Sequence, residues 1–359
     1  MSKFIKLLAA ATCLTIVAAP ALADQAPTLK IENFVGTVDV ETGSFSAITV
    51  TDADGAPVDK MGNDVTIDAG YKIDNSRCKQ NNLSIKIAVG KKKYVKRGGY
   101  KNLNEYPHMK IQAPANTRLV IEQAIIFGDV DDIGSGDIHV RSCGDLTLGD
   151  VAADLDLRIS GSGDVVMGAV GGDMDLGISG SGDVEMNGDI GGHLELGISG
   201  SGDAKIGSAG AANIRISGSG DLNGGNLESL ELKISGSGDV ILGAINGDVS
   251  VGSSGSSDVE LDRIGGGLKL TGGGSSDFDT DYVGGDIWIK LGGSGNIDIN
   301  DGNAQEVYIK ASGASHVSYE GAAKNIEARA SGAANISVNK PSGVLSVHEG
   351  GAGDVHVGK

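Results

Sequence analysis

The chain has 359 residues, with 47 acidic and 29 basic side chains and a formal net charge of −18. A protein this acidic is not expected to bind nucleic acid. Glycine occupies 59 positions and aromatic residues make up only 4% of the chain, a composition that favours narrow, closely packed β structure over a globular core built on rings.

The first residues predict a secretory signal peptide over residues 1–23. Lys3 and Lys6 form its basic region, an apolar run follows, and Ala21-Leu22-Ala23 is a small-x-small cleavage site. Beyond this segment, no stretch is apolar for the roughly 20 residues that a membrane helix requires. We therefore expect an extracytoplasmic protein, in the periplasm, secreted or at the cell surface, with no transmembrane segment after cleavage.

Residues 24–115 show strand signals without a strict repeat. Alternating runs such as Val38-Asp39-Val40 and Leu83-Ser84-Ile85-Lys86-Ile87 are separated by Asn, Asp, Gly and Pro. We expect an irregular β region that caps the array described next and protects its end from edge-to-edge aggregation. The basic run from Lys91 to Arg97, near Lys101, is interpreted as a solvated loop or as a docking patch for an anionic surface.

Two cysteines remain after the predicted cleavage, Cys78 and Cys143. An even pair in an exported protein predicts one disulfide. Such a bond would tie the irregular N-terminal region to the first regular coils. The alternative is two unpaired thiols.

Residues 116–359 carry a repeat whose corner motif is Ser-Gly-Ser-Gly-Asp, complete for the first time at Ser160–Asp164. Full and decayed copies return about every 19 residues from Asp145 to Asp354. Between the motifs, apolar and polar residues alternate, as in Met174-Asp175-Leu176-Gly177-Ile178, and this period of two indicates strands. The sequence therefore predicts an all-β fold, a single-stranded β-helix or β-solenoid, with two short strands in each coil.

The alternation also predicts where the side chains of the corner motif point. Counting in twos from Ile178 to Val184 places the two glycines inside the coil and the serines and the aspartate outside. We expect a constant corner in which a side chain at Gly182 would not fit, while the opposite turn absorbs differences in coil length. Each corner aspartate, such as Asp183, should accept backbone N–H bonds.

The corner motif differs in register from the calcium-binding nonapeptide of other β-helices. In that nonapeptide the apolar residue follows Asp by two positions, and both turns of each coil carry the motif. Here the apolar residue follows at once, as in Asp164-Val165, and one turn carries the motif. A calcium-loaded repeat protein stays an alternative, but we predict no cofactor and no bound metal.

No catalytic constellation is apparent in the sequence. Outward carboxylates stack at Glu260, Asp279 and Asp298, where they could raise one another's pKa values or form a solvated acidic stripe. A polysaccharide lyase or hydrolase built on a β-helix is therefore kept as an alternative to a non-enzymatic protein. The histidines, which show no zinc-ligand spacing, are His108, His139, His193, His316, His348 and His356.

The candidate ligand-binding site is the place where aromatic residues gather on an outer face. The alternation turns Trp288 outward, and Tyr308, one coil later, should stack beside it. Lys290, Lys310 and Arg329 form the neighbouring outward column. Exposed rings flanked by cations suit an acidic saccharide or peptide. The alternative is that another loop or a second subunit covers them.

The order of motifs resembles a known family. A secretion signal, the opening segment Lys30–Val38, the segment Met109–Pro114 and repeated Ile-Ser-Gly-Ser-Gly-Asp-Val are similar to the head GIN domain family of bacterial envelope proteins, which are labelled auto-transporter adhesins. The resemblance implies a β-helical fold and a binding or scaffolding role outside the cytoplasm. An envelope saccharide or protein is then the expected partner.

Overall fold

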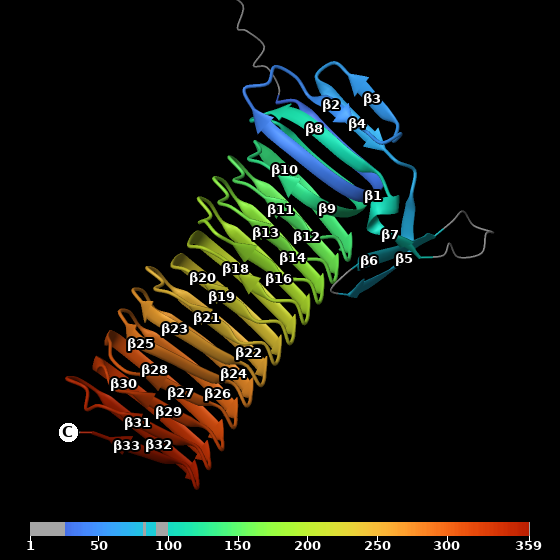
Figure 1. The fold of residues 1–359 in the computed structure, drawn as a ribbon. Coiled ribbons are helices and arrows are strands. Elements are labelled where there is room, and N and C mark those ends of the chain that lie inside the picture. The colour runs from blue at the N-terminus through green and yellow to red at the C-terminus, as the bar shows by residue number, and fades with distance from the viewer. Residues whose placement is uncertain (1–25, 82–83, 91–99, 359) are drawn as a thin grey trace, which may run out of the picture.

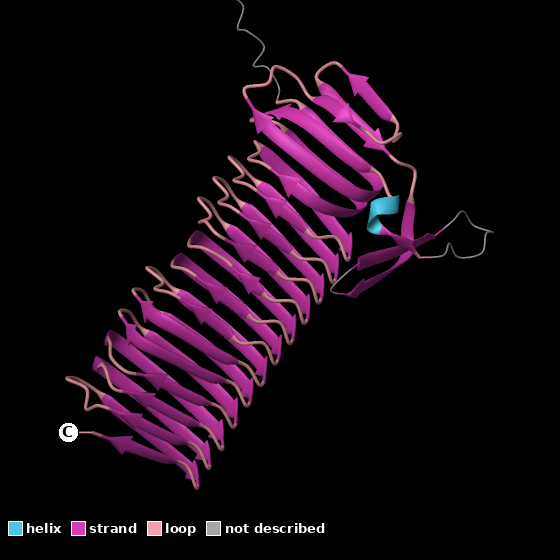
Figure 2. Cartoon of the chain, viewed as in Figure 1, coloured by secondary structure: helices cyan, strands magenta, loops and turns pink. Residues whose placement is uncertain are grey.

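The computed structural model describes residues 26–81, 84–90 and 100–358, so the predicted signal peptide and the basic run 91–97 lie outside the described residues. Parallel strands stack into one elongated rod that runs from the N-terminal strands to β32 and β33 (Figure 1). Strands form most of the chain, beside the short 3-10 helix η1 (Leu103–Glu105) (Figure 2). The predicted all-β solenoid is confirmed, with about 13 turns of about 19 residues each.

Each regular coil contributes one strand to a first face of the rod. The strands pair in parallel and in register, so that Leu157 lies beside Leu176 and Leu176 beside Leu196. The strands of this face are β10 (Ser135–Ser142), β12 (Leu155–Gly161), β14 (Met174–Gly180), β16 (Leu194–Gly200), β18 (Ala209–Gly218), β20 (Leu227–Gly236), β22 (Val249–Gly255), β24 (Leu268–Gly274), β26 (Ile287–Gly293), β28 (Asn303–Gly313), β30 (Ala322–Gly332) and β32 (Leu345–Gly351).

The second strand of each coil forms a second face. Here Val165 lies beside Val184, and Val184 beside Ala204. The strands of this face are β11 (Leu146–Leu148), β13 (Val165–Met167), β15 (Val184–Met186), β17 (Ala204–Lys205), β19 (Leu222–Gly224), β21 (Val240–Leu242), β23 (Asp258–Ile264), β25 (Asp277–Val283), β27 (Asn296–Ile299), β29 (His316–Tyr319), β31 (Asn335–Val338) and β33 (Asp354–Val357).

The inward side chains of both faces fill the interior of the rod. Leu176 and Leu196 are both fully buried. Single β-bridges join Val151, Val170 and Ile190 at the turn opposite the corner, and these residues close a third side of the coil. Because each coil buries its apolar residues against the coils before and after it, the stability of the rod arises from contacts between neighbours.

The N-terminal end is assembled out of chain order. β1 (Thr28–Gly43) pairs in parallel with β9 (Arg118–Val130), which continues into the regular coils. On its other edge β1 pairs with β4 (Asp64–Asp68) and β8 (His108–Pro114), which together form the outermost coil. The described chain therefore enters the rod in its second coil, forms the outermost coil next, and returns in β9 to pair with the opposite edge of β1.

An antiparallel layer closes this end. β2 (Thr49–Asp52) pairs with β8, and β3 (Val58–Met61) pairs with β4, both antiparallel. Antiparallel strands at this edge interrupt the parallel stacking and so limit end-to-end growth. The division into a capping region, 24–115, and a regular solenoid, 116–359, stays a prediction.

The chain segment between β4 and β8 forms a small side sheet that projects from the rod (Figure 1). It consists of β5 (Lys72–Asn81), β6 (Ser84–Gly90) and β7 (Lys101–Asn102), paired antiparallel. Its inner face packs on outward side chains of β1 and β9 and makes a second hydrophobic core. The buried members of this core are Val35, Ile73, Ile87, Tyr106, Ile125, Phe127 and Cys143.

A disulfide joins the side sheet to the rod. Cys78 on β5 bonds Cys143 in the first corner, with a Cα–Cα distance of 6.1 Å. Cys143 occupies the place of an outward serine in later coils, yet it is only 1% exposed because the side sheet covers it. The bond therefore links the irregular insertion to the regular coils.

The corner glycines meet the backbone of the preceding coil. Gly180 has φ +127°, a conformation that side-chain-bearing residues rarely adopt. A Cβ at Gly182 would lie 2.1 Å from the carbonyl oxygen of Gly163 and 2.9 Å from Cγ2 of Ile159. A side chain at either position therefore requires the coils to move apart.

Later coils admit small side chains at the inward corner position. Ser257 and Ser276 stand where earlier coils have glycine, and both are buried. The neighbouring inward residue is correspondingly small, since Ser253 lies beside Ile234 of the preceding strand. The hydroxyl oxygen of Ser253 lies 2.8 Å from that of Ser257 and 2.6 Å from that of Ser276, so the buried polar groups satisfy one another.

The corner aspartates form a ladder of hydrogen bonds along the rod. The backbone N–H of Asp183 donates to Oδ1 of Asp164 at 2.9 Å, and that of Asp203 donates to Oδ1 of Asp183 at 2.8 Å. The predicted bonds to backbone N–H groups are thus present, but the donor belongs to the next coil. Each carboxylate that accepts such a bond therefore links two coils.

Candidate functional site

An aromatic column lies on the first face in the C-terminal half of the rod. The register places Lys269, Trp288 and Tyr308 side by side on β24, β26 and β28. The rings of Trp288 and Tyr308 stack with centroids 5.9 Å apart and planes inclined by 15°. Nζ of Lys269 lies 5.8 Å from the centroid of the Trp288 ring. Trp288 remains 38% exposed, so this stack is accessible from solvent.

A basic column runs beside these rings. Lys290, Lys310 and Arg329 lie in register on β26, β28 and β30, as the alternation predicts. Arg329 is engaged by Glu327, with its Nε donating to Oε1 at 2.6 Å. Within the described part of the chain, Lys290 and Lys310 make no ion pair. Their ammonium groups are therefore free to meet an anion.

Lys269 is a site residue that the sequence reasoning missed. It stands one coil before Trp288, and the 19-residue spacing of the repeat would have placed it beside the ring. Together Lys269, Trp288, Lys290, Tyr308 and Lys310 form what we call the aromatic–lysine surface. Within the described residues none of the three lysines makes an ion pair, although Glu231 interacts electrostatically with Lys269, so the surface gathers cations on a protein of net charge −18.

A shallow groove leads to this surface along the first face. It has a volume of about 1120 Å³ and is lined from Glu195 through Asn213, Glu231 and Lys269 to Trp288. These residues occupy one outward column of successive strands, so the groove follows the axis of the rod. Four carboxylates, those of Glu195, Glu231, Asp248 and Asp286, line this groove, so it repels an anion and the attraction for one is confined to the aromatic–lysine surface.

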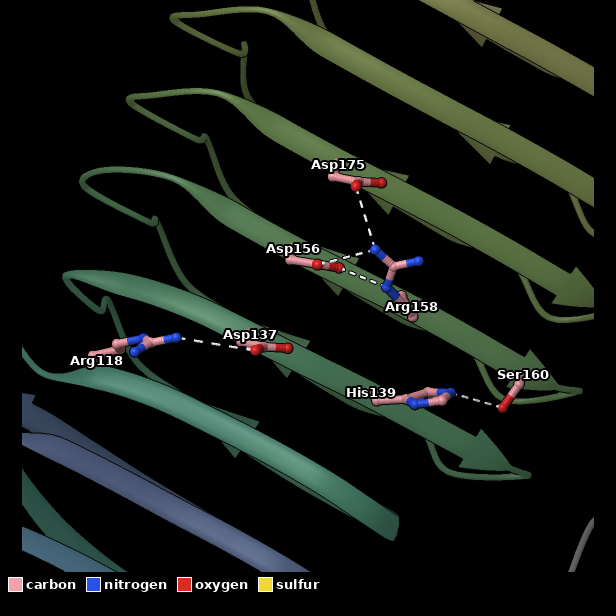
Figure 3. A network of polar contacts seen from close by, with 7 residues as sticks. All are labelled: Arg118, Asp137, His139, Asp156, Arg158, Ser160 and Asp175. Carbon is pink, nitrogen blue, oxygen red and sulfur yellow. Dashed lines mark hydrogen bonds and ion pairs between the residues drawn. The ribbon is translucent and has the colours of Figure 1, made fainter.

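A separate polar network covers the first face near the N-terminal end (Figure 3). Arg158 bridges two coils by pairing with Asp156 at 3.0 Å and with Asp175 at 3.3 Å. Nε2 of His139 lies 3.0 Å from Oγ of Ser160. Burial, followed by the charges of nearby arginines, lowers the pKa of His139. His139 and Ser160 form a hydrogen-bonded pair, but within the described residues no carboxylate hydrogen-bonds the ring to complete a nucleophilic triad.

The predicted acidic stack is present on the second face. Glu260, Asp279 and Asp298 lie in register on β23, β25 and β27. Burial is the main cause that raises the pKa of Asp279, and the charges of Asp298, Asp281 and Glu260 add to it. In the part of the chain that the structure describes, no group of three His, Cys, Asp or Glu residues is arranged to hold a metal ion.

Replacing millimolar calcium by a chelator should change the melting temperature by less than about 2 °C. The corner carboxylates from Asp145 to Asp239 already accept an N–H bond from the next coil, as Asp164 does from Asp183, and these bonds counteract the charge repulsion along the ladder. Thermal unfolding followed by circular dichroism checks this. A large stabilisation by calcium would show that the ladder is a cation site.

The rod, its outward columns and the groove define a β-solenoid with an extended outer face. Within the described residues, no helix has the length and apolar character needed to cross a membrane. A family model described as "Putative auto-transporter adhesin, head GIN domain" matches residues 63–226 and 266–358, and the chain belongs to this family. No curated protein and no solved structure matches the chain.

Proposed function

We propose that the protein is a non-enzymatic binding and scaffolding module of the cell envelope, adhesin-like in action, that holds an acidic saccharide or protein at the aromatic–lysine surface. The observation that carries the proposal is the stacked pair Trp288–Tyr308 set among Lys269, Lys290 and Lys310. Rings supply contact area with little loss of conformational entropy, and unpaired lysines supply attraction for an anion.

The family and the fold both support a binding role. Adhesin heads act outside the cytoplasm, which agrees with the predicted signal peptide and an extracytoplasmic location in the periplasm or at the cell surface. A solenoid provides many parallel positions at a constant spacing of about 4.8 Å along its axis, a geometry suited to a linear partner. The His139–Ser160 pair stays a weaker candidate for an enzymatic site, because among the described residues no third group hydrogen-bonds the imidazole.

Titration with an acidic glycan should change the intrinsic fluorescence of Trp288, which is the one tryptophan of the chain. A polyuronate serves as the probe and a neutral glucan as its control. Substitution of both Lys290→Gln and Lys310→Gln should weaken binding at least about tenfold, because two charge contacts are removed. Fluorescence titration of the full-length mature protein measures both effects.

The control variant is Lys324→Gln, which removes an exposed lysine at the same end of the rod but outside the two columns. Its affinity should equal that of the unaltered protein. Equal affinities for the polyuronate in the control and in the Lys290/Lys310 double variant would contradict the assignment of the site.

A further inference from the structure

The side sheet carries a charge opposite to that of the rod. Its described segments, residues 72–81, 84–90 and 100–106, contain five basic and two acidic side chains. The whole chain, by contrast, has a net charge of −18. The basic residues are Lys72, Arg77, Lys79, Lys86 and Lys101, all exposed, and the acidic ones are Asp74 and Glu105.

The alternation of β5 gathers three of these cations on one face. Cys78 points toward the rod and forms the disulfide, so Arg77 and Lys79 on either side of it point away from the rod. Lys86 on β6 pairs directly with Lys79. Arg77, Lys79 and Lys86 therefore share the outer face of the side sheet, which we call the cationic face.

Like charges directly opposite each other on antiparallel strands are destabilising. Lys79 and Lys86 are such a pair, and within the described residues neither they nor Arg77 has an ion-pair partner. The acidic residues of the segment are engaged elsewhere. Asp74 lies 3.9 Å from Arg141 on the rod, and Glu105 accepts hydrogen bonds from Asn102. The repulsion thus persists in the isolated protein and would be relieved by an anionic partner.

The form of the cationic face favours a lipid surface as that partner. Arg77, Lys79 and Lys86 are exposed and stand on two neighbouring strands, so the cations form part of a sheet face. Tyr100 lies beside them, 39% exposed, with Nζ of Lys79 4.5 Å from its ring centroid. Lysines with an adjacent exposed tyrosine are typical of segments that lie at a membrane interface.

We propose that the cationic face docks on an anionic lipid bilayer and holds the rod by its N-terminal end. Attraction acts on the side sheet within a Debye length of the headgroups, while the acidic rod is repelled from the same surface. The disulfide between Cys78 and Cys143 transmits this attachment to the coils. The aromatic–lysine surface, on distant coils, then remains free for its own partner. This attachment does not rest on the function proposed above.

Co-sedimentation of the mature protein with vesicles tests the proposal. Vesicles of phosphatidylcholine with one-third phosphatidylglycerol should bind the protein, pure phosphatidylcholine vesicles should not, and binding should fall as ionic strength rises. The double variant Lys79→Glu/Lys86→Glu should bind at least about tenfold more weakly. The conservative variant Lys79→Arg/Lys86→Arg should bind as the unaltered protein does.

A matched control carries the same change of charge at the far end of the rod, Lys324→Glu/Lys340→Glu, and should bind anionic vesicles normally. Circular dichroism establishes that every variant retains its strands. Equal loss of binding in the two charge-reversed variants would overturn the proposal, because net charge alone would then explain it. Absence of binding to anionic vesicles, or equal binding to both kinds of vesicle, would overturn it as well.

Discussion

Replacing Gly182 by valine should lower the free energy of unfolding by about 3 kcal/mol. A Cβ at this position would lie 2.1 Å from the carbonyl oxygen of Gly163, so the corner can accept the side chain only if two coils separate. Separation would also lengthen the hydrogen bond from Asp183 N to Asp164 Oδ1, which is 2.9 Å long. Urea unfolding monitored by circular dichroism measures the loss.

The matched control is Ser181→Val, one residue away. Ser181 is exposed and points outward, so valine there should change the free energy of unfolding by less than about 0.5 kcal/mol. Similar losses for the two variants would show that the glycine is not needed for close approach of the coils.

Removing the disulfide by Cys78→Ala and Cys143→Ala should cost about 4 kcal/mol, because the bond closes a loop with a sequence separation of 65 residues. The effect should be greatest in the side sheet, whose packing on the rod depends on the small core around Ile87 and Tyr106. Hydrogen exchange read by mass spectrometry separates the side sheet from the coils.

Exchange in β5 and β6 should accelerate strongly in this variant, while β14 and β16, which lie in the regular coils, should exchange at their original rate. Unchanged protection of the side sheet would mean that its apolar contacts hold it without the bond.

The regular coils could be predicted in detail because their pattern is local. The alternation from Met174 to Ile178 gives the buried side of a strand, and its repetition gives the partner in the next coil. Parity across the corner likewise predicted that Gly182 lies where no side chain fits, and the Cβ contacts agree. A repeat of about 19 residues therefore predicts which strands of successive coils pair, although each strand is recognised from a local pattern.

The N-terminal end could not be predicted in the same way. Placement of β1 between β9 and the β4–β8 coil depends on strands far apart in sequence, and no repeat marks their register. The side sheet shows alternation in residues such as Ile85 and Ile87, but this pattern does not say that the strands leave the solenoid. Non-local contacts decided both arrangements.

The sequence predicts which side chains of the candidate site lie in register, but not which of its cations form ion pairs. Stacking of Trp288 on Tyr308 follows from the strand register. Pairing of Arg329 with Glu327 depends on side-chain conformations that alternation does not specify, and it occupies one of the three cations predicted to flank the rings. Lys269 lies in the column of the rings and not in the column of Lys290 and Lys310. The 19-residue spacing of the repeat nevertheless predicts its place beside Trp288.

Retention on envelope material tests the binding role most directly. Trp288→Ala and Tyr308→Ala should each reduce binding to immobilised envelope extract by about 2 kcal/mol, roughly thirtyfold, if the rings are central contacts. Ile241→Ala removes an exposed apolar side chain (48% exposed) from the second face and should leave retention unchanged. If the Trp288 and Tyr308 variants are retained to the same extent as the Ile241 variant, the aromatic–lysine surface is not where the partner binds.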